Sequence, residues 1–299
     1  MKFDIVSFGS AVVDTFVNTE IKDKNNSFNY PVGAKILIKD LKFDIGGGGT
    51  NTAVAFARLG LKTGCICKIG DDNNGKDILN LLQKEKITFL GNISNEKTGY
   101  SVILDSTYKD RTILTFKGPN NKILLKDIKK FESKWLYFSA LLGQSFETQK
   151  KLAEILTKKG TKLAFNPSSY LIKHKNLTSL LKLTNILILN KQEAEMICKN
   201  KKSDLLVSLY ELGPRIVVIT DKDKKIECYD GIKKYFIIPH KNVKVVERTG
   251  AGDAFASGFV AGQIAGFDIQ KSLELGLEES ENVIRHFGAK NNLIKRKLK

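Results

Sequence analysis

Residues 245–255 read Val245-Val246-Glu247-Arg248-Thr249-Gly250-Ala251-Gly252-Asp253-Ala254-Phe255, and this stretch decides the fold. A strand-like run over 243–246 leads into it, and a helical pattern rich in small residues follows. The backbone amides of Gly250, Ala251 and Gly252 can therefore point into one concave anion site, which the positive end of the helix strengthens. Asp253 stands at the rim of that site. Because a carboxylate repels phosphate, its expected task is to accept a proton from an attacking hydroxyl group; a plain helix cap is the alternative.

A second glycine-rich loop, Gly46-Gly47-Gly48-Gly49-Thr50-Asn51, follows a strand-like segment over 41–45 and precedes an alanine-rich helical pattern. Four glycines remove every Cβ atom, so the backbone can approach a ligand closely at a helix N-terminus. A tight turn is the other interpretation, but a turn alone would need only one or two glycines. We therefore interpret residues 46–51 as a ligand-binding loop.

Two further glycine patterns resemble nucleotide-binding motifs without satisfying them. Gly47-x-Gly49-x-x-Thr52 lacks the third Gly or Ala of the dinucleotide fingerprint, although Asp71 lies roughly where a ribose-binding acid is expected. Residues 70–77 begin like a P-loop, but Asp77 replaces the Ser or Thr that holds magnesium, and two more acids stand where phosphate would lie. This second stretch is predicted to be a turn that caps a helix.

Strand-length apolar runs alternate with helical patterns along most of the chain. The runs are Ile5–Phe8, Gly64–Cys67, Trp135–Phe138, Leu163–Phe165, Ile186–Leu189 and Ile216–Ile219, and the helical patterns are Thr52–Leu59, Gly75–Lys84, Glu147–Lys158, Lys191–Cys198 and Ser203–Leu212. Near-continuous apolar strands suit a parallel sheet that is buried on both faces. The sequence therefore predicts an α/β fold with three layers, helix-sheet-helix, and a mostly parallel central sheet.

Two segments, about 13–44 and 98–116, break this alternation. Apolar and polar residues take turns in Ser101–Asp105 and Arg111–Phe116, and turn-rich loops such as 23–27 lie between such stretches. The pattern predicts antiparallel strands with one open face, which would form a small β-sheet lid over a ligand cleft. No repeat or linker divides the chain, so residues 1–299 are predicted to be a single domain that carries this lid.

Composition limits the classes of protein and the partners that the sequence can represent. Hydrophobic residues make up 42% of the chain and charged residues 27%, and no run approaches the roughly 18 apolar residues of a membrane helix. We expect a cytoplasmic protein with no membrane partner. The net charge of +17 favours anionic partners, but the lysines are spread along the chain, so no nucleic-acid partner is expected. Cys65 and Cys67 lie in an apolar run and are predicted to be buried free thiols.

Taken together, these motifs resemble the PfkB carbohydrate kinase family, whose fold is ribokinase-like, over essentially the whole chain. The matching segments are Gly9–Asp14 after the first strand, Gly46–Gly60 (GGGGTNTAVAFARLG), Gly70–Gly75, Thr98-Gly99 and Arg111-Thr112 in the lid region, Asn190–Glu193, and Thr249–Phe255. Two glycine-rich signatures in the family's order make the resemblance specific.

The resemblance implies an ATP-dependent phosphotransferase that moves the γ-phosphate to a hydroxyl group of a small sugar. Asp253 would be the general base, with the amides of Gly250, Ala251 and Gly252 as the anion hole. The other implied roles are spread along the chain: Asp14, Gly47, Gly48 and Asn51 would hold the acceptor, Thr220, Asn190 and Asn282 would contact the nucleotide with residues 283–288 beside the adenine, and Glu193, together with Asn190, would organise Mg²⁺ through water.

Two departures from the family pattern concern the cofactors. Glu247-Arg248-Thr249 stands where the family usually has Asp-Thr-Thr, which leaves the use of a monovalent cation open. Residues 220–226 (TDKDKKI) lack both glycines of the family's nucleotide-side loop, so the backbone is not expected to curl as it does in the family. Lysines in this loop can contact phosphates as point charges. The choice of phosphate donor therefore stays open.

Three further questions stay open. The acceptor is a sugar or a nucleoside, and a catalytically silent protein that binds sugar or nucleotide as a sensor is the alternative from another class. Phe16, Tyr30, Phe43 and Phe116 are candidates to line the lid, and residues 165–169 are a candidate neighbour of the cleft. Exposed lid strands can pair between chains to give a homodimer, or they can cap the cleft of a monomer.

Overall fold

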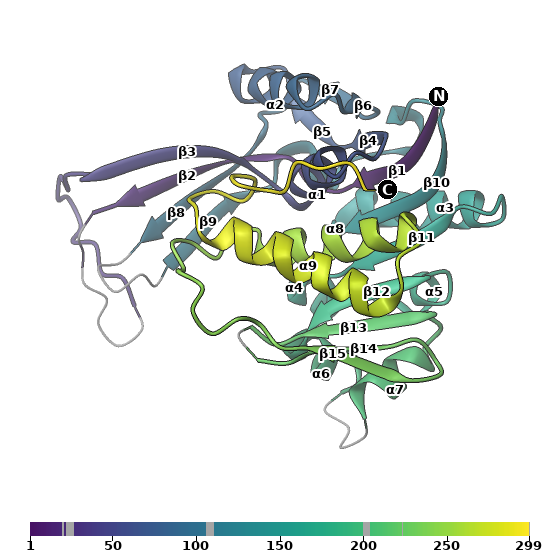
Figure 1. Cartoon of the computed structure of the whole chain (residues 1–299). Coiled ribbons are helices and arrows are strands. Elements are labelled where there is room, and N and C mark those ends of the chain that lie inside the picture. Colours follow the sequence, from purple (N-terminus) through teal and green to yellow (C-terminus); the bar gives the residue numbers. More distant parts are fainter. Residues whose placement is uncertain (20, 22–26, 106–110, 200–203, 223, 299) are drawn as a thin grey trace.

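A nine-stranded sheet forms the centre of the computed structural model, which describes residues 1–19, 21, 27–105, 111–199, 204–222 and 224–298 (Figure 1). The strands stand in the order β15-β14-β13-β12-β11-β10-β1-β4-β6. Their bounds are β1 Lys2–Phe8, β4 Thr63–Ile66, β6 Thr88–Phe89, β10 Glu132–Ser139, β11 Lys162–Asn166, β12 Ile186–Asn190, β13 Ile216–Thr220, β14 Ile226–Tyr229 and β15 Lys234–Ile237. Every pair from β6 to β13 is parallel, and β14 and β15 add an antiparallel edge. The predicted, mostly parallel sheet is confirmed.

Helices cover both faces of this sheet, and strand β10 shows why. Leu136 and Phe138 pack into one hydrophobic core, whereas Trp135 and Tyr137 pack into the core on the opposite face. The first core is completed by α3 (Gly143–Thr157), α4 (Ser169–His174), α5 (Thr178–Leu181), α6 (Lys191–Ile197) and α7 (Leu205–Tyr210), and the second by α1 (Gly48–Arg58), α8 (Ala251–Ile264) and α9 (Ile269–Ile284). Because both faces are buried, the strands need continuous apolar runs. The three-layer prediction is confirmed.

Two predicted elements differ from the structure. Residues 243–246 do not form the expected strand; the amides of Val246 and Glu247 donate to the carbonyl of Ile284, at 2.8 and 3.2 Å, and so dock this segment on the end of α9. The last carbonyl groups of a helix have no hydrogen-bond partner inside the helix. Here the carbonyl of Ile284 accepts from these two amides, which therefore need no neighbouring strand. The predicted helix 203–212 is shorter, since α7 spans Leu205–Tyr210 and Ser203 lies outside the described residues.

The predicted lid is a separate four-stranded sheet that extends from one end of the core (Figure 1). Its strands are β3 (Asp40–Gly46), β2 (Val12–Asn18), β8 (Gly99–Asp105) and β9 (Arg111–Phe116), in that order. The pairs β2–β3 and β8–β9 are antiparallel, but β2–β8 is parallel, so the expectation of antiparallel strands alone is wrong. The reason is that β2 and β8 both lead outward from the core and lie next to each other. The turn at 23–26 and the side chain of Arg111 lie outside the described part.

The four aromatic residues expected to line the lid divide between its two faces. Phe16 is buried and packs edge-on against Phe287, with ring centroids 4.5 Å apart. Phe43 and Phe116 are 62% and 53% exposed, and Tyr30 stands partly exposed in the connecting segment. Only Phe16 therefore faces the body of the protein.

The P-loop-like stretch is the predicted capping turn. Asp72 is the N-cap of α2 (Asn73–Lys84), and its Oδ1 accepts a hydrogen bond from the amide of Gly75 at 2.9 Å. Asp72 also accepts bonds from the amide and hydroxyl of Thr98, at 2.9 and 2.6 Å. The turn thus ties α2 to the start of β8. The short strands β5 (Lys68–Gly70) and β7 (Asn92–Ser94) pair beside it, and two 3₁₀ turns, Gly118–Asn121 and Leu125–Asp127, follow the lid.

The four cysteines are buried, and none of them forms a disulfide bond. A hydrogen bond with Cys67, together with burial, raises the pKa of the Cys65 thiol well above its usual value. Among the described residues, none of the helices combines the length and the hydrophobicity that crossing a membrane demands.

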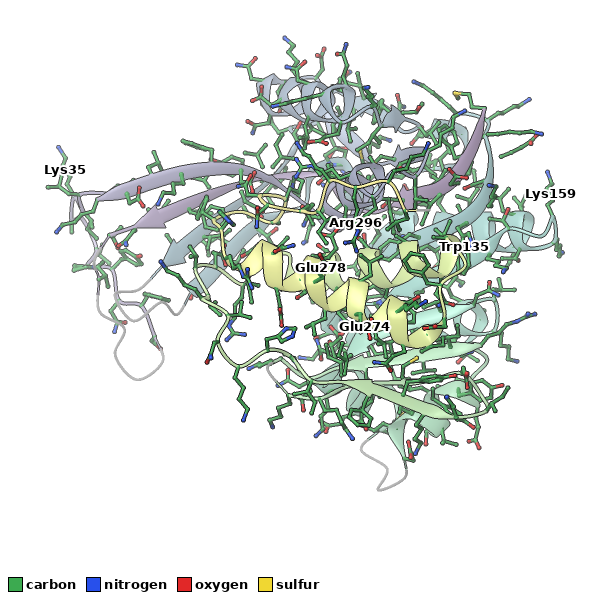
Figure 2. The ribbon with its side chains drawn as sticks, viewed as in Figure 1. Lys35, Trp135, Lys159, Glu274, Glu278 and Arg296 are labelled. Carbon is green, nitrogen blue, oxygen red and sulfur yellow. The ribbon has the colours of Figure 1, made fainter. Side chains whose placement is uncertain are left out.

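Glu279 on α9 is a buried acid outside the site region. It has no exposed surface, its Oε2 accepts a hydrogen bond from the amide of Ile294 at 3.1 Å, and its Oε1 has no hydrogen-bond partner among the described residues. Next to it, Glu278 and Arg296 pair at 3.0 Å where the C-terminal segment crosses α9 (Figure 2). Burial raises the pKa of Glu279 to about 7. The folded protein therefore keeps a proton on this carboxyl up to about pH 7, whereas the unfolded chain releases it near the ordinary pKa of 4.5.

Glu279→Gln is expected to stabilise the protein only at higher pH. An acid whose pKa is raised on folding costs stability as pH rises through the interval between the two pKa values, here from 4.5 to about 7. Unfolding in urea should show little difference between variant and wild type near about pH 5, and a gain of about 2–3 kcal/mol for the variant near about pH 8. Glu278→Gln, on the exposed neighbour, is the control. A gain that is the same at both pH values would contradict this account.

Candidate active site

Four polar residues stand at the edge of the central sheet where its parallel strands end. Ser139 ends β10, Asn166 ends β11, Asn190 ends β12 and Thr220 ends β13, and the register pairs Ser139 with Asn166 and Asn190 with Thr220. Open α/β sheets bind their ligands at this edge. Two of the predicted nucleotide contacts, Asn190 and Thr220, are therefore neighbours at the expected place.

The predicted anion loop begins helix α8. Gly250 is the N-cap, with φ of +80°, and a Cβ there would lie 2.5 Å from Cβ of Ala289, so both conformation and space require glycine. Gly252 differs, because a Cβ there would meet nothing within 4 Å and the residue is exposed. The amide of Ala251 donates a long bond, 3.3 Å, to the carbonyl of Arg248 within the turn. Packing thus explains the first glycine but not the second.

Asp253 lies in the first turn of α8 and joins the two glycine-rich loops. Its Oδ2 accepts a hydrogen bond from Nδ2 of Asn51 at 2.8 Å, and its Oδ1 lies 3.7 Å from where a Cβ of Gly48 would be. Gly250, not Asp253, caps the helix, so the plain helix-cap interpretation is wrong. Burial raises the pKa of Asp253, while the bond from Asn51 and the charge of Lys290 lower it. A carboxylate so placed holds a proton more readily than an exposed one, as a general base requires.

The glycine-rich loop over residues 46–51, the predicted acceptor loop, packs more tightly than the sequence suggested. A Cβ would lie 1.8 Å from Oδ2 of Asp14 at Gly46, 2.4 Å from the carbonyl of Ser10 at Gly47, and 2.8 Å from Cβ of Ser139 at Gly48. Gly49 is equally close to the backbone of Gly9. Of the four glycines only Gly47 has a positive φ, so the turn itself needs one glycine, as expected, and the protein's own packing accounts for the other three. Their ligand contacts remain a prediction.

Asp14 lies in a polar row across the lid. The register aligns Asp44 on β3, Asp14 on β2, Ser101 on β8 and Thr115 on β9 on one face of that sheet. Asp14 is 9% exposed, and burial raises its pKa, against a hydrogen bond with Ser101 and the charges of nearby lysines. Gly46 leaves the space that this carboxylate occupies. The row places Asp14 where the lid meets the glycine-rich loop.

Glu193 and Asn190 form a capping box at the start of α6. Asn190 Oδ1 accepts from the amide of Glu193 at 2.9 Å, Glu193 Oε2 accepts from the amide of Asn190 at 3.0 Å, and Glu193 Oε1 accepts from the amide of Ser169 at 3.0 Å. Burial raises the pKa of Glu193. Oε1 also accepts a second bond from the hydroxyl of Ser169 at 3.2 Å, whereas Oε2 can still accept one, so the pair fits Mg²⁺ held through water rather than by direct contact. In the described part of the chain, no three His, Cys, Asp or Glu residues gather as direct metal ligands.

A cavity of about 470 Å³ opens beside the acceptor loop. Both apolar and polar residues line it: Ser10, Thr115, Lys117, Asn120, Asn121, Ala140, Leu141, Leu142, Ser168, Tyr170 and Leu171. Ser10 connects the cavity to the loop, because its carbonyl accepts from the amide of Gly49 at 2.9 Å. Of the predicted cleft neighbours 165–169, Ser168 lines this cavity.

A comparison with known families decides the classification. The model described as pfkB family carbohydrate kinase matches residues 2–296, nearly the whole chain. The chain belongs to the pfkB family of carbohydrate kinases. The resemblance predicted from the two glycine-rich signatures is therefore confirmed.

Known proteins place this pfkB family kinase among enzymes named for sugars and for nucleosides. It is 25% identical to the cytidine kinase of Thermococcus kodakarensis over 301 residues, 95% of this chain and 97% of that protein. It is 28% identical to the ribokinase of Haemophilus influenzae over 260 residues, 83% of each. The structure of Arabidopsis thaliana ribokinase complexed with ribose and ATP matches with a TM-score of 0.79 at 20% identity, over 97% of this chain and 95% of that one. The ribokinase-like fold is confirmed.

The nucleotide-side loop of this pfkB kinase begins at Thr220 and turns without glycine. Lys222 adopts φ of +49°, and the amide of Lys224 donates to the carbonyl of Asp221 at 2.8 Å, while residue 223 lies outside the described part. The backbone therefore turns here without glycine, and the expectation that it does not follow the family's path stays a prediction. Thr220 begins this loop, whereas the carbonyl of Asn282 accepts from Asn292 of the C-terminal segment at 3.3 Å. In the other glycine-rich signature, Thr249–Phe255, Thr249 donates its amide and its hydroxyl to Glu247, at 2.8 and 2.7 Å.

Sequence reasoning missed Lys290. Its amine donates to Oδ1 of Asn51 at 2.6 Å and to the carbonyl of Ile45, and the residue is only 4% exposed. It lies two positions after residues 283–288, which the resemblance placed beside the adenine. Between them, Ala289 packs against Gly250 and donates its amide to Asp44 at 3.2 Å. In a lysine-rich sequence nothing distinguishes this lysine from the exposed ones.

Proposed function

We propose that this kinase transfers the γ-phosphate of ATP to a hydroxyl group of a small sugar or nucleoside, with Asp253 as the general base. The observation that carries the proposal is the meeting of Asp253 with Asn51 of the acceptor loop, at the start of the helix that presents Gly250, Ala251 and Gly252. A proton acceptor, an acceptor loop and a set of amides at a helix N-terminus are what phosphoryl transfer requires of a protein.

The proposed reaction follows from these positions. The acceptor hydroxyl, held by Asp14, Asn51 and the loop Gly47-Gly48, gives its proton to Oδ1 of Asp253. Its oxygen then forms a bond to the γ-phosphorus as the bond from that phosphorus to the bridging oxygen breaks, and ADP leaves with the electron pair. The amides at 250–252 offset the charge on the phosphoryl oxygens. Mg²⁺, when bound with ATP, neutralises phosphate charge, and Glu193 with Asn190 would hold it through water.

Two features bear on the acceptor. The row of Asp14, Asp44 and Ser101 suits the hydroxyl groups of a sugar. The neighbouring cavity adds an apolar wall with Tyr170 and Leu141, which would accommodate a nucleobase, and one relative is named a cytidine kinase. We therefore keep a sugar as the first candidate and a nucleoside as the second.

A panel assay tests the proposal and separates the candidates. The protein is incubated with ATP, Mg²⁺ and single pentoses, hexoses or nucleosides, and ADP release is measured. Release with one acceptor supports the proposal and names its class. Tight acceptor or nucleotide binding without ADP release from any member would favour the silent sensor instead. We place the enzyme in the cytoplasm, where ATP is available and buried thiols stay reduced, and cell fractionation checks this location.

We also propose a homodimer through the lid. Leu41, Phe43, Leu114 and Phe116 share the outer face of the lid by register and are 47%, 62%, 56% and 53% exposed. Such an apolar face is typical of an interaction site. Light scattering should give the mass of two chains for the wild type and of one chain for a variant carrying both Phe43→Glu and Leu114→Glu. A wild type that has the mass of one chain at micromolar concentration would refute the dimer.

A further inference from the structure

Lys290 is a buried lysine at a junction of three parts of the molecule. Its amine donates to the carbonyl of Ile45, at the end of lid strand β3, and to Oδ1 of Asn51 in α1 at 2.6 Å. Asn51 in turn donates from Nδ2 to Oδ2 of Asp253 in α8 at 2.8 Å. A chain of two hydrogen bonds therefore leads from the lysine to the proposed base.

The backbone of Lys290 is held as firmly as its amine. Its carbonyl accepts a hydrogen bond from Nη1 of Arg58 at 2.6 Å. Arg58 is itself fixed by two bonds to the carboxylate of Glu85, at 2.5 and 3.1 Å. Because both ends of Lys290 are anchored, the amine has a defined position rather than a range of rotamers.

We propose that Lys290 is a positioning residue of the base: its amine fixes the side-chain amide of Asn51, and Asn51 thereby holds the Asp253 carboxylate with Oδ1 toward the acceptor loop. The proposal rests on the proposed function for the role of Asp253 as a base. The fixed orientation of the Asn51 amide rests on the hydrogen bonds alone.

The chemistry of the amide group explains the effect. An asparagine side chain has one oxygen that accepts and one nitrogen that donates, and a rotation by half a turn exchanges them. With a protonated amine beside it, the oxygen must face Lys290, so the nitrogen must face Asp253. Without that donor, the two orientations of Asn51 would compete, and the reversed one would place an oxygen against the carboxylate.

The charges around this junction favour the ammonium form. Burial lowers the pKa of the Lys290 amine overall, although three carboxylates oppose this shift, and two oxygen acceptors take hydrogens of the amine. The charged and titratable groups that face the pair are Asp44, Asp14, Arg58 and Tyr137. Lys290 thus provides a fixed positive charge near Asp253, which holds the pKa of that carboxyl below the value burial alone would give.

Lys290→Met tests the proposal, with Lys295→Met on the exposed part of the same segment as the matched control. With the acceptor found in the panel assay, kcat should fall by about tenfold to a hundredfold with little change in the KM for the acceptor, because the base is misplaced rather than the acceptor lost. The acidic limb of the kcat/KM profile should move to higher pH by about one unit, because removing a neighbouring positive charge raises the pKa of Asp253. The control should match the wild type.

Asn51→Leu provides a second variant that leaves Lys290 in place. If Lys290 acts through Asn51, adding Lys290→Met to this variant should lower kcat by little more. Additive losses in the double variant would overturn the proposal, and so would wild-type kcat and pH dependence in Lys290→Met. Should Lys290→Met fail to fold, slow hydrogen exchange of the Asn51 side-chain amide in the wild type supports the fixed orientation, and fast exchange refutes it.

A carboxyl titration separates this proposal from the proposed function. The ¹³C signal of the Asp253 carboxyl, assigned by its loss in Asp253→Asn, reports the pKa of that group without substrate. A higher pKa in Lys290→Met supports the positioning role even if no acceptor is turned over. An unchanged pKa refutes it even if the kinase activity is established.

Discussion

Asp253→Asn is expected to lower kcat by about 10²–10⁴-fold, the usual contribution of a positioned proton acceptor. An amide cannot take the proton of the acceptor hydroxyl at neutral pH. It has nearly the same shape, however, and its oxygen can still accept the hydrogen bond that Asn51 donates to Oδ2 at 2.8 Å. The loss should therefore appear in turnover, with acceptor and ATP affinities changed much less. ADP release with the acceptor found in the panel assay measures it.

The variant should also be at least as stable as the wild type. Burial raises the pKa of Asp253, which means that the ionised carboxylate costs folding energy at neutral pH that a neutral amide does not. Asp268→Asn is a matched control: it is another acid at a helix start, whose Oδ1 accepts from the amide of Lys271 at 2.7 Å, but it lies at the N-cap of α9. Wild-type turnover in Asp253→Asn would remove this residue as the base.

The sequence predicted the pieces of the site better than their contacts. Both glycine-rich loops lead into a helix, and glycines at a helix N-terminus are a local signal of a ligand loop, so Gly47 and Gly252 could be found without coordinates. The hydrogen bond between Asn51 and Asp253 depends on how α1 packs against α8, and the two residues are 202 positions apart in the sequence. Local patterns carry no such information. Lys290 was missed for the same reason, since its burial depends on Arg58, Ile45 and Asn51 together.

The wrong predictions have local causes. The run Val243–Val246 has strand-like residues, but the amides of Val246 and Glu247 bond to the end of α9 rather than to a strand, and no sequence pattern separates those two kinds of partner. The parallel pairing of β2 with β8 follows from chain direction, because each strand leads outward from the core before its hairpin turns back. Lys222 is a different case, because a lysine there adopts the left-handed conformation in a loop that lacks the family's glycines.

Gly252→Ala is expected to separate stability from activity. Gly252 lies in helix α8, is exposed, and a Cβ there would meet nothing within 4 Å. Alanine is the better helix former, so the substitution should stabilise the protein by about 0.5–1 kcal/mol. If the backbone at 250–252 receives the transferred phosphoryl group, the same methyl group would stand in the anion site. We then expect kcat/KM for ATP to fall on the order of 10²-fold, the usual loss when one donor of such a site is removed.

Gly250→Ala is the matched variant, because the two glycines lie two positions apart but the fold requires glycine only at position 250. Gly250 has φ of +80°, and its Cβ would lie 2.5 Å from that of Ala289, so this substitution should lower the melting temperature as well as the activity. Thermal unfolding and ADP release, measured on both variants, give the comparison. A more stable Gly252→Ala protein with reduced kcat/KM for ATP can be explained only by space kept open for a ligand, because the fold itself does not use that space. Full activity in that variant would mean that phosphate binds elsewhere, and the anion-hole assignment of residues 250–252 would be wrong.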